Sequence, residues 1–104
     1  MLSSAAYPQL TGSRTPAVLD PKTYRAARAI GVNGPFVTDA LEAAALRTRS
    51  EVASRAVEAG AHLVLYTDET LSKAGRRDVR ANVSQELIAE RAEQVRALRS
   101  SLSF

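Results

Sequence analysis

Cysteine and tryptophan are both absent from this chain of 104 residues, while phenylalanine occurs twice and tyrosine three times. Without cysteine the chain has no disulfide framework, no thiolate zinc site and no cysteine nucleophile. The single histidine, His62, has no second imidazole with which to complete a zinc or carboxylate-bridged metal site. These absences remove several classes of enzyme, and we expect His62 to be a structural or surface residue.

Long hydrophobic runs are also missing. The longest, residues 61–66, is far shorter than the ~20 residues that span a bilayer, and it contains His62. The first residues lack a basic segment followed by an apolar one, so we expect no conventional secretory signal. We therefore expect cytoplasmic synthesis without membrane insertion. Export by a signal-independent route and incorporation into a virion or other large complex both remain open.

Alanine is abundant instead, with 19 residues. It favours helices but offers little area to bury, so a single copy of the chain would have a thin core. The length fits one domain. We therefore predict closely packed helices that bury further surface against partner subunits, including other copies of the chain.

Charge is unevenly distributed along the chain, whose net charge is +3. Residues 1–34 carry four basic residues against one acid, residues 35–75 four against six, and residues 76–104 six against four. An acidic middle between basic ends favours self-association through complementary electrostatic fields.

Residues 1–20 are predicted to form an extended or disordered arm. Pro8, Gly12 and Pro16 interrupt any regular period, and serine and threonine lie between them. The sequence leaves open whether this arm is a free tail or lies across a neighbouring subunit.

A short helix is predicted over residues 21–30. Asp20 and Pro21 suit its N-cap and first helical position, and Gly31 suits its C-terminal end.

A long amphipathic helix is predicted over residues 35–74, with a kink at Gly60. Apolar or small residues recur on one stripe at spacings of seven and four. A helix of that length cannot be enclosed in a small globule, so it must pack against a second long helix or another chain. The alternative is a strand at residues 62–66 in a small α/β unit, with residues 17–19 as its only candidate partner.

The next break is predicted at residues 73–77. A last amphipathic helix is expected from residue 78 to about residue 99, followed by a frayed tail at residues 100–104. We therefore predict an all-α fold. An extended arm precedes a helical domain at residues 21–99, in which a short helix and two long amphipathic helices form a hairpin or open bundle.

Small side chains along the long helix form the predicted interface. They allow two helix backbones to approach closely. We predict that one stripe serves both packing within the chain and contact between subunits, through Ala45, Val52, Ala56, Ala59, Gly60, Leu63 and Tyr66.

A basic cluster, Arg76, Arg77 and Arg80, lies near the predicted start of the last helix. Arginine is unfavourable at a helix N-terminus, which indicates a partner there. The cluster could contact a phosphate or nucleic acid. A protein interface is favoured, because the cluster is small, has no interleaved aromatic residue and shares its helix with four acids.

Catalytic and phosphate-binding motifs are absent from the sequence. We therefore predict no catalytic, cofactor-binding or metal-ligating residue, no cofactor and no small-molecule substrate. The leading hypothesis is a non-enzymatic structural or assembly subunit that oligomerises, such as a virion component or a connector. A small nucleic-acid-binding regulator is the first alternative.

Residues 33–36, Asn-Gly-Pro-Phe, precede the alanine-rich predicted helix, and this arrangement resembles the small helical-hairpin substrates of type VII secretion. The resemblance covers about residues 30–75 and implies a secreted hairpin without a signal peptide as a further alternative. The Trp-x-Gly turn of that family is absent, and neither Tyr24 nor Tyr66 is followed four residues later by an acid.

Overall fold

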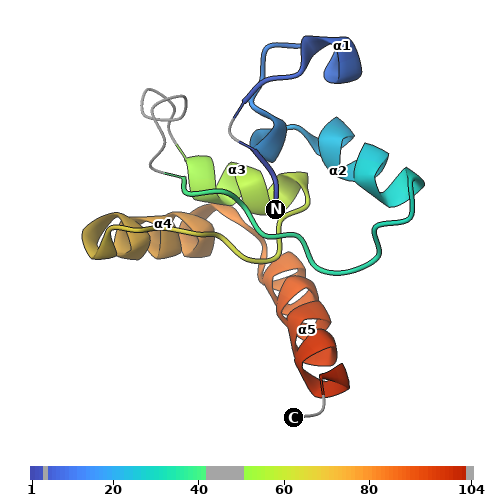
Figure 1. Cartoon of the computed structure of the whole chain (residues 1–104). Coiled ribbons are helices and arrows are strands. Elements are labelled where there is room, and N and C mark those ends of the chain that lie inside the picture. Colours follow the sequence, from blue (N-terminus) through green and yellow to red (C-terminus); the bar gives the residue numbers. More distant parts are fainter. Residues whose placement is uncertain (4, 42–50, 103–104) are drawn as a thin grey trace.

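The computed structural model describes residues 1–3, 5–41 and 51–102, and it is mostly helical (Figure 1). The predicted all-α class is therefore confirmed. The described residues form isolated β-bridges but no sheet. In chain order the elements are α1 (Pro8–Thr11), the 3-10 helix η1 (Ala17–Leu19), α2 (Pro21–Ala29), α3 (Val52–Ala59), α4 (Glu69–Asn82) and α5 (Gln85–Ser101).

The short helix expected from local capping signals is present as α2. Asp20 Oδ1 accepts a hydrogen bond from Lys22 N at 3.0 Å. Pro21 occupies the first turn, where its missing N–H is not needed. The helix ends at Ala29, and Gly31 follows with a φ of 101°. The capping residues alone locate this helix correctly.

The single long helix predicted over residues 35–74 is wrong. Residues 35–41 are not helical, α3 has only 8 residues, and residues 61–67 contain no helix. Gly60 ends α3 with a φ of 148°, a backbone conformation that other residues rarely adopt. The part of the prediction that falls on residues 42–50 lies outside the described residues.

The break predicted at residues 73–77 is also wrong, because α4 runs through it. Gly75 lies inside α4 against Tyr66, and a Cβ at this glycine would be 2.7 Å from the ring Cε2 atom. Glycine serves close packing here rather than helix termination. The break falls instead at Ser84, whose Oγ accepts a hydrogen bond from Leu87 N at 3.2 Å and caps α5.

Three extended segments lie side by side in parallel. One parallel bridge joins Leu2 to Thr38. The other joins Val37 to Leu63. Leu2 N donates to Val37 O at 2.9 Å, and Asp39 N donates to Leu2 O at 2.9 Å. From the same middle segment, Thr38 N donates to Leu63 O at 3.0 Å. A helix separates each segment from the next, as parallel pairing requires.

The alternative prediction, a strand at residues 62–66 paired with residues 17–19, agrees with the structure only in part. Leu63 is bridged, but its partner is Val37. Residues 17–19 form η1 instead, and Val18 within it is fully buried. The apolar pattern of the sequence therefore did not identify Val37 as the partner of Leu63.

The core lies where η1, α2 and α3 meet. Tyr24 and Phe36 pack edge to face with ring centroids 5.2 Å apart, and Tyr24 Oη donates to Val18 O at 2.7 Å. Residues 1–20, which we expected as an extended or disordered arm, contain α1 and η1 and fold onto the same chain. The buried cluster comprises Val18, Leu19, Tyr24, Phe36, Leu41, Ala53, Ala56 and Ala61.

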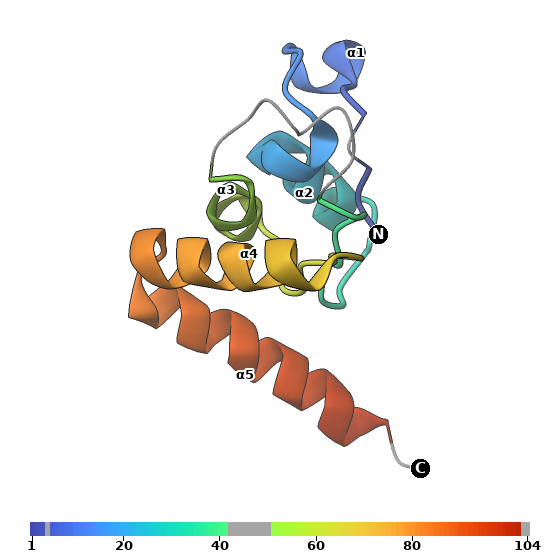
Figure 2. The ribbon, with the colours of Figure 1, turned by 90° about the vertical axis from the view of Figure 1, so that its left-hand side faces the viewer.

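The last two helices diverge from their junction. Figure 2 shows α4 passing beneath α3, and α5 leading away from that layer. No residue of α5 is buried, whereas α4 buries Gly75. None of the described helices is both long and apolar enough to cross a membrane. One side of α5 is therefore unpartnered within the described chain.

Candidate functional site

Two carboxylates follow the parallel segments at their carboxyl ends. Asp39 comes directly after the middle segment, and Asp68 follows the segment that contains Leu63. In parallel α/β architectures this end of the strands is where ligands and catalytic groups gather. These two residues are therefore the first candidates for catalytic or binding groups.

Only one of these two carboxylates is without a structural task in the described part of the chain. Asp68 is the N-cap of α4, where its Oδ1 accepts from Leu71 N at 2.9 Å. Asp39 is exposed, and its Oδ1 accepts from the N–H of the next residue, Ala40, at 2.8 Å. No sequence motif distinguishes Asp39, because its position depends on the parallel pairing of segments that are far apart in the chain.

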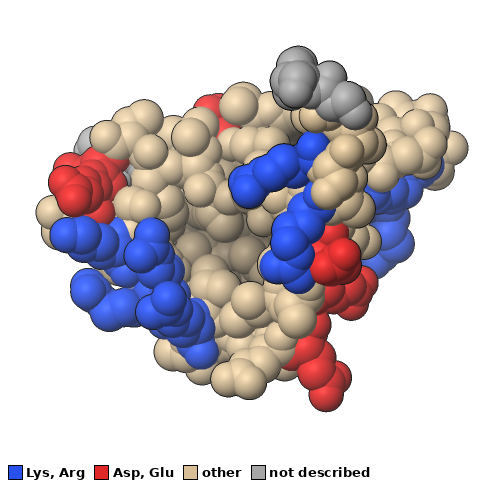
Figure 3. Space-filling model, turned by 90° about the horizontal axis from the view of Figure 1, so that it is seen from below, with Lys and Arg blue, Asp and Glu red and all other residues tan. Residues whose placement is uncertain are grey.

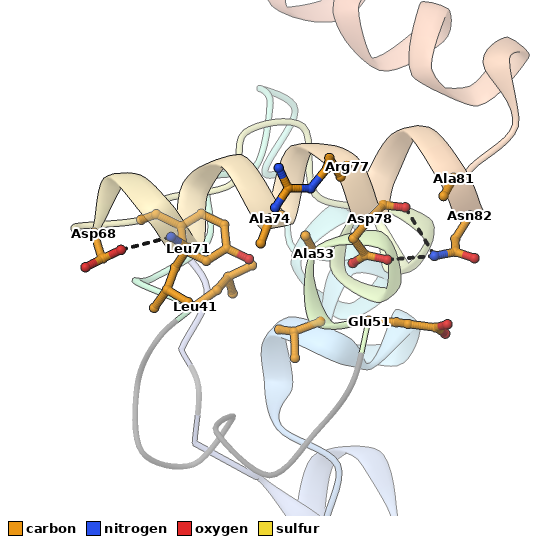
Figure 4. A pocket seen from close by; sticks show the side chains of 13 residues that line it. Leu41, Glu51, Ala53, Asp68, Leu71, Ala74, Arg77, Asp78, Ala81 and Asn82 are labelled. Atoms are coloured by element: carbon orange, nitrogen blue, oxygen red, sulfur yellow. Dashed lines mark hydrogen bonds between the residues drawn. The ribbon is translucent and has the colours of Figure 1, made fainter.

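A hollow of about 790 Å³ lies between α3 and α4 (Figure 4). Two of its carboxylates, Asp68 and Asp78, hold helix ends. Asp78 Oδ2 accepts from Ser54 N at 2.9 Å in the first turn of α3, and its Oδ1 accepts from Asn82 Nδ2 at 2.8 Å. An acid at this position satisfies an unpaired N–H and favours the helix dipole. The lining is Leu41, Glu51, Val52, Ala53, Tyr66, Asp68, Leu71, Ala74, Gly75, Arg77, Asp78, Ala81 and Asn82.

His62 joins two parts of the fold. Its Nδ1 accepts from Phe36 N at 3.0 Å, so the ring proton lies on Nε2, which donates to Gln94 Oε1 at 2.6 Å. Burial lowers the pKa of His62, and the hydrogen bond to Gln94 partly opposes that shift. A neutral imidazole bonded on both nitrogens serves as a structural link between the middle segment and α5. Among the described residues, no cluster of metal-ligating side chains is present.

The predicted small-residue stripe does not lie on one helix face. Ala56 is fully buried in the core, and Val52, Ala59 and Tyr66 pack partly against it. Leu63, on the extended segment, is 44% exposed. Ala45 lies outside the described residues. Gly60 contacts Tyr24, since a Cβ built there would be 2.6 Å from the tyrosine Cγ.

The three predicted arginines are on α4, but not at a helix start. Arg76, Arg77 and Arg80 lie in the second half of that helix, where the dipole favours cations. Arg77 lines the hollow between α3 and α4. The other two line a different hollow, so the structure divides the cluster between two places.

No protein-family model matches the sequence, and no curated protein matches it. Several solved structures are similar in fold, and two of them are compared with this chain. One is the glycoside hydrolase family 3 β-N-acetylglucosaminidase from Paenibacillus sp. str. FPU-7, with a TM-score of 0.77 and 27% sequence identity over 89% of this chain and 20% of that chain. The other is CbsA from Thermotoga neapolitana, with a TM-score of 0.81 and 17% identity over 98% of this chain and 25% of that chain. The chain thus spans between a fifth and a quarter of the length of these structures.

Proposed function

We propose that this chain is one section of a glycosidase-type catalytic fold and that it works when joined to further β/α units. The observation that carries this proposal is the position of Asp39, an exposed carboxylate at the carboxyl end of the middle one of three parallel segments. The likeness to a family 3 β-N-acetylglucosaminidase supports it. The substrate class that we propose is a β-linked N-acetylglucosaminide.

The need for further units follows from the parallel segments themselves. Parallel sheets are found almost only with both faces covered. Here Leu63 and Leu65 remain 44% and 39% exposed on the outermost segment. Additional β/α units, on the same or another polypeptide, would cover these side chains and extend the layer.

The proposed chemistry needs two carboxylates. Most glycosidases use a pair of acidic residues, one that donates a proton to the leaving oxygen and one that acts as nucleophile or base. Asp39 would supply one member of the pair. Asp68 and Asp78 already hold helix N-termini in this chain. We propose that the second member comes from an added unit.

The test is hydrolysis of a p-nitrophenyl N-acetyl-β-glucosaminide by the protein in the joined form in which it occurs. We expect Asp39→Asn to lower kcat at least ~10³-fold, as removal of a central catalytic group does. Glu69→Gln is the matched control. Glu69 is exposed, and its ion pair with Lys73, at 3.5 Å, is also exposed and therefore weak. Activity that survives Asp39→Asn, or a joined form without glycosidase activity, would refute the proposal.

The second candidate is the non-enzymatic assembly subunit expected from the alanine-rich sequence. The observation that favours it is α5, which has no buried residue; Leu98 within it is 41% exposed, and Leu102 at its C-cap is 51% exposed. Light scattering at several concentrations separates the two. A stable assembly of this chain alone, without any glycosidase activity, would favour the assembly role.

Two other sequence hypotheses remain predictions. A nucleic-acid-binding regulator requires that Arg76, Arg77 and Arg80 contact one ligand, and alanine at all three positions should then abolish a salt-sensitive binding. A secreted hairpin should appear in culture medium when the secretion system is intact.

A further inference from the structure

A groove opens between α4 and α5, in addition to the hollow between α3 and α4. It consists of two adjoining hollows of about 380 and 340 Å³. Figure 3 shows it as a depression of uncharged residues with Lys and Arg on both flanks. We call it the α4–α5 groove. The residues that line both hollows are His62, Leu63, Val64, Val79 and Ile88.

The floor of the groove includes a free segment edge. Leu63 N donates to Phe36 O at 3.1 Å, and Leu65 N donates to Thr38 Oγ1 at 2.9 Å, so both face the middle segment. Alternation along an extended chain turns the backbone N–H and C=O of Val64 to the opposite side. Within the described part of the chain these two groups have no hydrogen-bond partner.

The flanks of the groove carry an excess of positive charge. Arg76 and Arg80 line it from α4, and Arg91, Arg96 and Arg99 line it from α5. In the described residues the one ion pair among these five is Arg96 with Glu93, at 2.8 Å and largely exposed.

One arginine is also held partly inside the groove. Arg91 Nη2 donates to Val57 O at 3.2 Å, whereas its Nε is buried and has no partner in the described residues. The hydrogen bond to Val57 O therefore fixes the guanidinium of Arg91 at the wall of the groove.

We propose that the α4–α5 groove binds an extended segment of one of the further β/α units, in which apolar and acidic residues alternate. The segment pairs with the backbone of Val64, its apolar side chains cover Leu63 and Ile88, and its carboxylates face the arginines. An extended segment satisfies the free N–H and C=O, which a helix cannot do. A second copy of the same groove is disfavoured because like charges would meet. This inference rests on the proposed function, in which further β/α units join this chain, and it names the chemistry of the contact between them.

The probe is a blocked peptide of about eight residues, the length of an ordinary strand, in which valine and glutamate alternate. The control peptide replaces each glutamate with lysine. Binding to the chain of 104 residues is measured by fluorescence anisotropy at low and high salt, and protection of the Val64 amide by hydrogen exchange. We expect the valine–glutamate peptide to bind, to protect Val64 and to weaken with salt, because the flanking charges are exposed. The lysine peptide should not bind.

Variants of the chain locate the charge contribution. Arg80→Gln and Arg99→Gln should each weaken binding by roughly threefold to fivefold, the effect of one exposed charge pair. Arg14→Gln, at an exposed position outside the groove, should leave binding unchanged. Equal binding of both peptides, binding without protection of Val64, or no binding would each overturn the inference.

The peptide measurement does not depend on catalysis, so its outcome is separable from that of the hydrolysis assay. Binding with no glycosidase activity in the joined form would retain the joint and remove the proposed function. Glycosidase activity of the joined form without peptide binding would retain the proposed function and remove the proposed peptide site.

Discussion

Replacing Gly60 with alanine tests how tightly the end of α3 is fitted against Tyr24. Two costs combine at this position. The backbone has a φ of 148°, which a residue with a Cβ adopts at a cost of roughly 1–3 kcal/mol. The new Cβ would also lie 2.6 Å from Tyr24 Cγ and 2.9 Å from its Cβ, an overlap that costs roughly 1–3 kcal/mol.

Tyr24 cannot move aside to relieve this overlap. It is 4% exposed, its Oη is bonded to Val18 O at 2.7 Å, and its ring packs on Phe36. The two costs therefore add, and Gly60→Ala should lower the free energy of unfolding by about 2–6 kcal/mol. For a chain of this size the melting temperature should fall by at least about 8 °C.

The assay is urea unfolding followed by far-ultraviolet circular dichroism, with thermal unfolding alongside. Gly34→Ala is the matched control, because a Cβ there meets no atom within 4 Å and the φ of Gly34 is not positive. That control should change stability by less than about 1 kcal/mol. A Gly60→Ala protein within about 1 kcal/mol of the wild type, with an unchanged urea dependence, would refute the reasoning.

Three further predictions concern polar contacts. Asp78→Ala should cost about 1–2 kcal/mol in urea unfolding, because Ser54 N in the first turn of α3 loses its acceptor; an unchanged midpoint would count against this tertiary cap. Burial lowers the pKa of His62 below 6.5 in the folded chain, so that, as the pH falls, His62 is protonated in the unfolded chain before it is protonated in the folded one. Stability should therefore be constant above about pH 6.5 and fall below it; a His62→Gln protein with the same slope would contradict this. Thr38→Val should cost about 1–2 kcal/mol by removing the Oγ1 that accepts from Leu65 N, and a thermal scan equal to that of wild type would exclude the contribution.

Local signals in the sequence located some elements correctly. Asp20 and Pro21 fixed the start of α2, because a cap and a first-turn proline act through neighbouring backbone atoms alone. The all-α class was predicted from the abundance of alanine, which has a high helix propensity. The boundary between α4 and α5 lies at Ser84 and not at Gly75, because Gly75 serves close packing against Tyr66 and Ser84 caps α5.

The path of the chain around Gly60 depended on tertiary contacts. A seven-residue apolar period fits one long helix, but it fits equally well a short helix followed by an extended apolar segment. Tyr24, which is distant in sequence, occupies the space beside Gly60, and Val37 provides the partner for Leu63. Neither contact is visible in the local pattern.

The candidate site was missed for the same reason. Asp39 is an ordinary acid in the sequence, and it becomes distinctive only because Leu2 and Leu63 are bridged to the segment that precedes it. The arginines of the α4–α5 groove are likewise spread over two helices. Their common surface could be recognised only after the divergence of those helices was known.

The parallel arrangement of the three segments also governs how the chain reaches its fold. Each bridge joins residues that are far apart in sequence, so a large loop must close before either bridge contributes. The helices between them can form from local contacts in far less time. During synthesis Thr38 leaves the ribosome before Leu63, so the bridge to Leu2 can form before the bridge between Val37 and Leu63.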